Sequence, residues 1–205
     1  MIIGICGFQS SGKDTIANYL VKEHGFARFS FASALKDIIS LMFGWPREQL
    51  EGLTTADREW REEIDPWWAN SLKMPHLTPR FVMQHFATEL FRKHFHPDIW
   101  VKIVERNLYD FLYANNNPNI VISDCRFKNE IDMILSFGGK IIQAHRNTPA
   151  WFYSYRRGEP TREIETMHRS EIEWIRCHRD YDIENNGSLY ELYTKIKYIA
   201  DAVKL

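Results

Sequence analysis

The chain has 205 residues, of which 26 are Lys or Arg and 27 are Asp or Glu, so its formal net charge is −1. This size fits one domain. The balance of charge argues against a protein that binds DNA or RNA polymers, because such proteins usually carry a basic surface. With 44% hydrophobic residues the chain can build a core, and no apolar run reaches the roughly 18 residues that span a bilayer. We therefore expect a cytoplasmic protein.

The three cysteines give no sign of a cross-linked or zinc-bound structure. Cys6, Cys125 and Cys177 are irregularly spaced and form no CxxC pair. An odd number at such spacing indicates neither a disulfide framework nor a zinc site. We predict free thiols.

The first part of the chain alternates between apolar runs of strand type and amphipathic stretches of helix type. The predicted elements are a buried strand over 2–6, a helix over 14–24 that Gly25 ends, a strand over 27–31 and a helix over 34–43. Residues 44–78 are rich in Trp and Pro. They predict short helices that form a cap, not a second domain.

The second part continues the alternation. Thr78 and Pro79 are typical of a helix start, and the elements predicted from there are helices over 79–94 and from 97, a strand over 120–122, a helix ending at Gly138, strands over 140–144 and 181–184, and a helix over 188–203. Residues 151–180, with many charges, predict a mobile surface segment followed by a helix. Strands that alternate with helices predict a parallel α/β sheet of about five strands, with ligands at the carboxyl ends of the strands.

Residues 7–15 lie between the first strand and the first helix and come close to the phosphate-binding pattern G-x-x-x-x-G-K-[ST]. In this pattern backbone N–H groups and a helix N-terminus surround a phosphate chain, and the lysine reaches the β and γ phosphates. The residues predicted to bind ATP are Gly7, Ser10, Ser11, Gly12, Lys13, Asp14 and Thr15. The alternative is a glycine-rich turn that binds nothing.

Asp14 departs from the pattern, because Ser or Thr normally stands there and gives a hydroxyl to Mg²⁺. An acid is favourable at a helix N-terminus. Asp14 can hold Mg²⁺ directly or through water, with Thr15 one residue later, and the sequence leaves both open. Asp124, after the strand over 120–122, is predicted to face the same Mg²⁺.

Arg126 and Glu130 follow Asp124 closely. The guanidinium of Arg126 suits a substrate phosphate, and Glu130 lies one helical turn further on. The alternative is a surface ion pair between these two residues.

Several further blocks occur in a recognisable order along nearly the whole chain. They are Ser11-Gly12-Lys13-Asp14-Thr15, Ala34-Leu35-Lys36-Asp37, Arg80 with Met83-Gln84 and Thr88-Glu89, Trp100-Val101-Lys102, Asp124 with Arg126 and Glu130, His168 with Ser170-Glu171, and Asn186-Gly187-Ser188-Leu189. On these blocks the chain resembles the deoxynucleoside monophosphate kinases of T-even-type bacteriophages, which belong to the P-loop nucleoside monophosphate kinases.

The resemblance implies one P-loop kinase domain over residues 1–205, with a substrate-binding cap at about 44–96 and a lid at about 147–166. It implies transfer of the γ-phosphoryl group from ATP, with Mg²⁺, to a deoxynucleoside monophosphate that is used for DNA replication. It also allows a homodimer. The base preference stays open.

The resemblance further implies a role for particular residues. Those expected to be catalytic are Lys13, Asp124, Arg126 and Arg157, and those expected to bind substrate are Lys36, Arg80, Gln84, Thr88, Trp100, Arg126, Glu130, Arg156, Arg162, His168 and Glu171. For the lid arginines the alternative is a solvated charged face, for His168 it is a structural role, and for Trp100 it is packing.

Two other functions stay open at this point. The first is a P-loop kinase for another small phosphorylated acceptor, such as phosphomevalonate. The second is a nucleotide-dependent switch, which has no need of cations for an acceptor.

Overall fold

The computed structural model describes residues 1–116 and 118–203, and the chain forms two compact units. The first, which we call the sheet unit, combines Met1–Ser30 with Val104–Leu205, and the second, the helical unit, is Phe31–Ile103. The cap expected at about 44–96 lies inside the helical unit. Among the described helices, none combines the length and the apolar character that crossing a bilayer requires.

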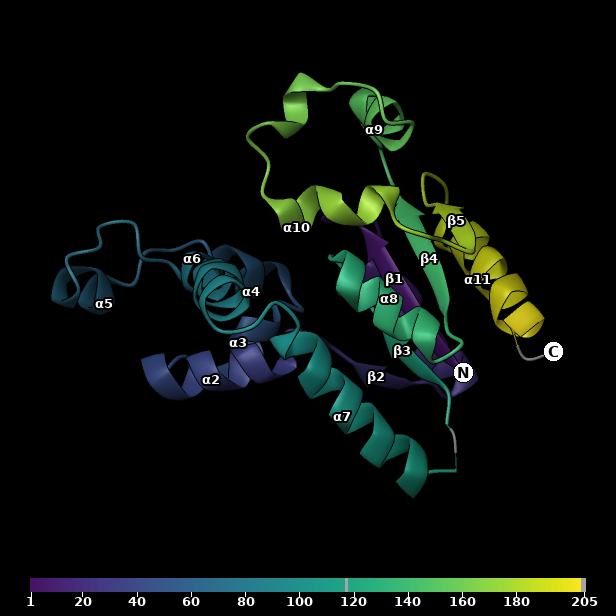
Figure 1. The fold of residues 1–205 in the computed structure, drawn as a ribbon, viewed down its shortest axis with the longest axis horizontal. Helices are drawn as coiled ribbons and strands as arrows, with labels where there is room; N and C mark the ends of the chain where they lie inside the picture. The colour runs from purple at the N-terminus through teal and green to yellow at the C-terminus, as the bar shows by residue number, and fades with distance from the viewer. Residues whose placement is uncertain (117, 204–205) are drawn as a thin grey trace. The chain divides into compact units, whose positions relative to one another are not determined.

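Five parallel strands make up the sheet of the sheet unit, in the order β2-β3-β1-β4-β5 (Figure 1). Their bounds are β1 Ile2–Gly7, β2 Ala27–Phe29, β3 Ile120–Ile122, β4 Lys140–His145 and β5 Tyr181–Glu184. The five predicted strands and their parallel arrangement are confirmed. The second strand ends at Phe29 and not at residue 31, because the chain leaves the sheet there and Phe31 already belongs to the helical unit.

Helices cover both faces of this sheet. The three long ones confined to the sheet unit are α1 Lys13–His24, α8 Lys128–Ser136 and α11 Leu189–Val203. Because side chains alternate along a strand, Ile3 and Ile5 of β1 join the buried cluster that includes residues of α1 and α11, whereas Gly4 faces Ile134 of α8. A Cβ at Gly4 would lie 2.6 Å from Cδ1 of Ile134. Glycine here lets α8 pack close to the sheet.

The stretch predicted as a surface segment followed by a helix folds into several short helices. Their bounds are α9 Ala150–Arg156, the 3₁₀-helix η2 Arg162–Ile164, α10 Arg169–Ile172 and the 3₁₀-helix η3 Glu173–Arg176. Phe152 and Trp174 are buried, and their rings lie 5.7 and 5.1 Å from that of Phe8, centroid to centroid. Phe152 and Trp174 thus pack both ends of the segment against the core. The high charge content of the stretch does not indicate these two buried residues.

The helical unit has its own apolar core, which includes Trp45, Leu50, Leu77 and Trp100. Its elements are α2 Ser33–Phe43, α3 Arg47–Glu51, α4 Thr55–Trp60, α5 Pro66–Ser71, α6 Pro79–Gln84 and the π-helix η1 His85–Lys93, and α7 Ile99–Ala114 begins here and continues into the sheet unit.

The helix predicted over 79–94 is confirmed at its start. Thr78 Oγ1 accepts a hydrogen bond from the N–H of Phe81 at 3.1 Å, as a helix cap does. From His85 onward the chain winds as the π-helix η1. A π-helical turn holds more residues than an α-helical one, so residues after Gln84 do not keep the side-chain spacing of the α-helix predicted there.

We expect Leu20→Ala to lower the free energy of unfolding by about 2–5 kcal/mol, because Leu20 of α1 is fully buried and its truncation leaves a cavity. The measurement is urea unfolding followed by circular dichroism. Leu189→Ala is the matched control, since Leu189 is 60% exposed at the start of α11, and its effect should stay within about 0.5 kcal/mol. Equal effects of the two substitutions would contradict the packing described here.

Candidate active site

The loop between β1 and α1 lies at the carboxyl edge of the sheet, where parallel α/β proteins bind ligands. Its backbone needs glycine at two positions: φ is +151° at Gly7 and +98° at Gly12. A Cβ at Gly7 would lie 2.4 Å from the carbonyl oxygen of Ala144 in β4. The loop therefore passes β4 too closely for any side chain at residue 7.

A side chain from the turn between β5 and α11 holds the same loop. The amide Nδ2 of Asn185 donates to the carbonyl oxygen of Ser11 at 3.1 Å, and Asn185 is 9% exposed. A Cβ at Gly12 would lie 2.3 Å from this Nδ2. Sequence reasoning missed Asn185, although the block that begins at Asn186 directly follows it.

Lys13 folds back over the loop. Its Nζ donates to the carbonyl oxygens of Gly7 at 2.9 Å and of Phe8 at 2.6 Å. Burial, followed by the nearby guanidinium of Arg126, lowers the pKa of Lys13 to about 8, while the carboxylates of Asp14 and Glu171 oppose this shift. Lys13 and Arg126 are thus close enough to repel each other, and an anion between them would relieve that repulsion.

Arg126 and Glu130 have separate roles at the start of α8. The guanidinium of Arg126 forms an ion pair with Glu171. Glu130 is 2% exposed, and its carboxylate accepts from the N–H groups of Arg126 at 2.7 Å and Phe127 at 3.1 Å. Glu130 therefore caps α8, and its burial gives no support to the prediction that it binds substrate.

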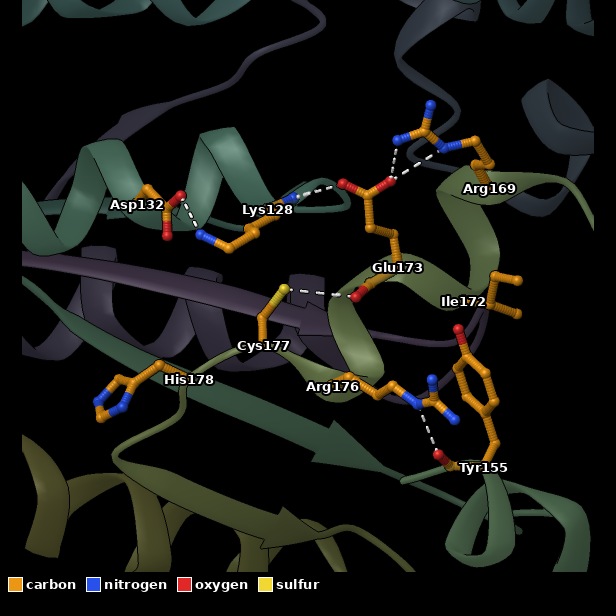
Figure 2. A pocket seen from close by; sticks show the side chains of 9 residues that line it. All are labelled: Lys128, Asp132, Tyr155, Arg169, Ile172, Glu173, Arg176, Cys177 and His178. Atoms are coloured by element: carbon orange, nitrogen blue, oxygen red, sulfur yellow. Dashed lines mark hydrogen bonds and ion pairs between the residues drawn. The ribbon is translucent and has the colours of Figure 1, made fainter. Parts of the chain in front are cut away.

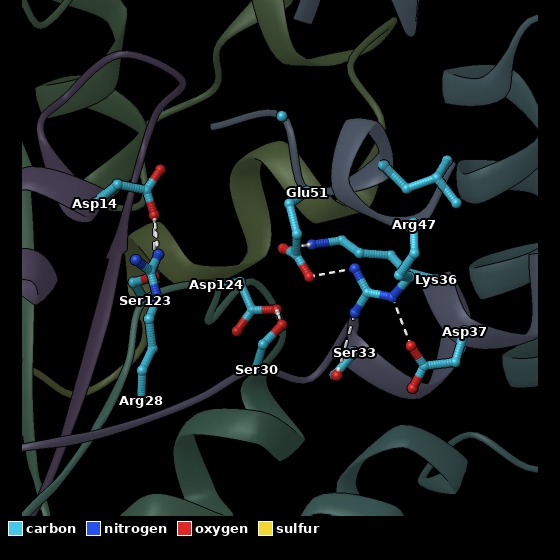
Figure 3. A network of polar contacts seen from close by, with 12 residues as sticks. Asp14, Arg28, Ser30, Ser33, Lys36, Asp37, Arg47, Glu51, Ser123 and Asp124 are labelled. Carbon is cyan, nitrogen blue, oxygen red and sulfur yellow. Dashed lines mark hydrogen bonds and ion pairs between the residues drawn. The ribbon is translucent and has the colours of Figure 1, made fainter. Parts of the chain in front are cut away.

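Asp14, in the first turn of α1, is held by residues of two strand ends (Figure 3). Arg28 of β2 forms an ion pair with its Oδ1, and Ser123, directly after β3, donates to the same atom at 3.1 Å. Arg28 also donates to Ser123 Oγ at 2.8 Å and to Asn18 Oδ1 at 2.8 Å. Sequence reasoning missed Arg28, whose signal was a charged side chain within the strand predicted over 27–31.

The oxygen donors at this edge suit a magnesium ion that also binds phosphate oxygens. Asp124 Oδ2 accepts from Ser30 Oγ at 2.7 Å, and the contact of its neighbour Ser123 with Asp14 brings the two predicted acids to the same strand end. Thr15 follows Asp14 and is half-buried. Within residues 1–116 and 118–203 there is no group of three or more His, Cys, Asp or Glu side chains that could hold a metal. Mg²⁺, however, commonly uses one or two carboxylates with waters and phosphates.

The predicted lid arginines have different surroundings. Arg156 donates to both carboxylate oxygens of Asp182, at 2.7 and 3.0 Å, and to Gln143 at 3.1 Å. Arg157 pairs with Glu159 at 2.6 Å on the surface, and Arg162 is exposed at the start of η2. Arg156 therefore ties α9 to β4 and β5, which leaves Arg157 and Arg162 as the accessible cations among these three.

His168 and Glu171 do not act as one pair. His168 Nδ1 accepts from the N–H of Ser170 at 3.3 Å and lies 2.8 Å from its hydroxyl, so the histidine caps α10. Glu171 pairs with Arg126. These contacts support a structural role for His168, the alternative to substrate binding.

In the helical unit, Lys36 belongs to a dense polar network (Figure 3). Its ammonium binds Glu51 at 2.6 Å, and Arg47 pairs with both Glu51 and Asp37. Partial burial tends to raise the pKa of Glu51, but hydrogen bonds from Lys36 and Arg47 outweigh this effect and lower it. The charge of Lys36 is compensated within the unit.

The other predicted residues of the helical unit differ in their access to a ligand. Arg80 pairs with Glu62, Gln84 is exposed, and Thr88 is half-buried. Trp100 is 2% exposed, and its Nε1 donates to the carbonyl oxygen of Ala87 at 3.1 Å. The packing alternative for Trp100 therefore has the better support.

A separate cavity of about 480 Å³ lies beside α8, α9 and η3 (Figure 2). Its charged groups satisfy one another: Lys128 pairs with Asp132 at 2.5 Å and Arg169 with Glu173 at 2.6 Å. Cys177, one of the three free thiols predicted and found, lines it, and burial raises the pKa of this thiol to about 11. None of the predicted site residues lines this cavity.

Comparison with known proteins gives consistent results. Residues 51–196 match the family model described as "Deoxynucleotide monophosphate kinase". The "Putative deoxynucleotide monophosphate kinase" of Acanthamoeba polyphaga mimivirus is 31% identical to this chain, and the alignment covers 96% of this chain and 94% of that protein.

Solved structures are more distant. Dephospho-CoA kinase from Campylobacter jejuni aligns over 98% of this chain and 96% of its own, with a TM-score of 0.49 and 15% identity. Shikimate kinase from Aquifex aeolicus aligns over 100% and 98%, with a TM-score of 0.46 and 16% identity.

We expect ATP binding to take up about 0.5 to 1 proton at pH 8.5 and much less at pH 7. With a pKa of about 8, Lys13 is mostly neutral at pH 8.5 in the free protein, and a bound phosphate raises that pKa, so affinity should fall as the pH rises through 8. Calorimetry in buffers of different ionisation enthalpy measures the uptake. Lys13→Arg is the control, because its guanidinium stays protonated. The same uptake in this variant would contradict the assignment to Lys13.

Proposed function

The chain belongs to the deoxynucleotide monophosphate kinase family, and from this premise we propose that it transfers the γ-phosphoryl group of ATP to a deoxynucleoside monophosphate at the loop of residues 7–15. The observation that carries the proposal is the geometry of this loop: φ is positive at Gly7 and Gly12, and Lys13 Nζ folds back onto the carbonyl oxygens of Gly7 and Phe8. A second cation supports it. The ammonium of Lys13 and the guanidinium of Arg126 are close enough for the second to lower the pKa of the first. Two cations that repel each other in this way are suited to a polyanion.

In this proposal Lys13 binds the β and γ phosphates of ATP and Arg126 binds the phosphate of the acceptor. Phosphoryl transfer depends mainly on positioning and on neutralising charge. Lys13 exchanges its hydrogen bonds with the loop carbonyls for bonds to phosphate oxygens. Arg126 exchanges its ion pair with Glu171 for one with the acceptor. The acceptor phosphate is already an anion near neutral pH, so no general base is needed.

The helical unit supplies the remaining acceptor contacts in this proposal. Arg80 binds the acceptor phosphate when it leaves Glu62, and Gln84 and Thr88 contact the nucleoside. Lys36 orders the surrounding acids, and Trp100 supports the segment through its bond to Ala87.

Residues 147–166 serve as the lid. Arg157 and Arg162 supply its cations, and Arg156 anchors it through Asp182. A lid that closes over both substrates excludes water and so protects ATP from hydrolysis.

Asp14, Thr15 and Asp124 would hold Mg²⁺ together with the phosphate oxygens of ATP. When bound, this ion neutralises charge on the β and γ phosphates. It retains several waters, so these residues can act directly or through water.

The test is ADP release in a coupled assay with ATP and each of the four common deoxynucleoside monophosphates, with phosphomevalonate as a comparison acceptor. Stimulation by at least one deoxynucleotide supports the proposal. Stimulation by phosphomevalonate alone would favour another P-loop kinase. A slow ATP-only rate that no acceptor raises would favour a nucleotide-dependent switch.

We expect Lys13→Ala to lower kcat with the best deoxynucleotide by at least ~100-fold, as the loss of a charged donor at a transferred group does. Lys22→Ala is the matched control, since Lys22 stands at the other end of α1 with its side chain 84% exposed. Steady-state kinetics of the two variants make the comparison. A Lys13→Ala enzyme with wild-type kcat would remove Lys13 from the reaction.

We expect Arg126→Ala to raise the KM for the deoxynucleotide about 10- to 100-fold and to leave the KM for ATP nearly unchanged, because it deletes a charge-assisted bond to the acceptor. Arg169→Ala is the control, since Arg169 lies close by on α10 and its side chain is 76% exposed. If Arg126→Ala lowered only kcat, the acceptor role would be wrong.

A further inference from the structure

An acid at residue 14 poses an electrostatic problem for this loop. Asp14 lies in the first turn of α1, beside Lys13 and near the end of the loop of residues 7–15. A carboxylate stabilises the helix N-terminus on which it stands. The same N-terminus has to receive the phosphates of ATP, however, and two negative groups a few ångströms apart repel each other. The charge of Asp14 has to be compensated before a phosphate chain can bind well.

Arg28 is placed to supply this compensation. It comes from β2, at the edge of the sheet, and its guanidinium spans three partners. One terminal nitrogen binds both Asp14 Oδ1 and Ser123 Oγ (Figure 3). The other binds Asn18 Oδ1 at 2.8 Å. Asn18 lies one helical turn after Asp14. The guanidinium of Arg28 therefore contacts side chains of two successive turns of α1.

The same contacts orient the carboxylate. Asp14 Oδ1 receives both Arg28 and the hydroxyl of Ser123, and the side chain of Asp14 is 56% exposed. Because Oδ1 is held by these two contacts, the orientation of the whole Asp14 carboxylate is fixed. Only a residue that is both cationic and forked can hold Asp14, Ser123 and Asn18 together.

We propose that Arg28 is a positioning residue of the nucleotide site: it neutralises and orients Asp14, so that a phosphate loop with an acid at its hydroxyl position binds ATP. The inference rests on the proposed function, because it assumes that residues 7–15 bind ATP. It adds a role for a residue of β2, outside the loop, and predicts that this role exists only while residue 14 is an acid.

The test is a double-substitution cycle on the full chain, with ATP affinity measured by calorimetry in EDTA and again with Mg²⁺. We expect Arg28→Met to weaken metal-free ATP about tenfold or more, because it exposes the phosphates to an uncompensated carboxylate. MgATP should be weakened less, since the cation replaces part of the lost charge. In the Asp14→Asn background, Arg28→Met should change the affinity by less than about threefold. Arg28→Lys should retain more affinity than Arg28→Met.

One control separates this role from a general effect on folding. Arg106→Met removes an exposed arginine of α7. It should bind ATP within about twofold of the wild type, and thermal unfolding checks that every variant is folded.

Two results would overturn the inference. The first is wild-type affinity in Arg28→Met. The second is the same loss from Arg28→Met whether or not Asp14→Asn is also present, since a direct contact of Arg28 with phosphate or a purely structural role predicts that loss. A wild-type protein that binds no ATP would instead overturn the proposed function itself, so the two failures are distinguishable.

Discussion

The close contact between Gly7 at the end of β1 and the carbonyl oxygen of Ala144 in β4 determines where the phosphate loop lies. No side chain fits at residue 7, so the loop begins directly against the neighbouring strand. Phe8 then packs against the rings of Trp151, Phe152 and Trp174, with centroids 5.6, 5.7 and 5.1 Å away. The loop therefore shares one aromatic cluster with α9 and η3. In the chain, α9 lies near the start of the proposed lid and η3 follows its end. Aromatic packing of this kind is close and directional. A movement of α9 or η3 would therefore displace Phe8 and with it the loop.

The formal charge of −1 conceals a local arrangement of paired charges. At the proposed site Asp14 is paired with Arg28 and Glu171 with Arg126. The ammonium of Lys13 donates to neutral carbonyl oxygens, and burial depresses its pKa. A partly buried cation whose hydrogen-bond acceptors are uncharged gains from a bound anion. The near-neutral chain can therefore hold a polyanion at one place without a basic surface.

Much of the fold could be predicted from local patterns. The five strands, the helix that Thr78 begins and the glycine-rich loop all follow from residue periodicity and turn chemistry, which act within a few residues. The site was less predictable residue by residue. Glu130 and His168 stood out as polar residues in a recognisable order, yet their side chains accept hydrogen bonds from backbone N–H groups at helix starts. A capping residue and a ligand-binding residue have the same chemistry in a sequence, and only the position of the acceptor distinguishes them.

By itself the sequence determined the order of strands and helices and the phosphate loop, because these depend on residues that are close together in the chain. It also determined the family, through the order of several blocks along nearly the whole chain. Tertiary structure alone decided which side chains from distant elements meet. Arg28 reaches Asp14, Asn185 reaches Ser11, and Arg156 reaches Asp182. Sequence periodicity carries no information about these contacts, since they depend on which strands are neighbours in the order β2-β3-β1-β4-β5. That order brings the ends of distant strands to one edge, where their charges compensate one another.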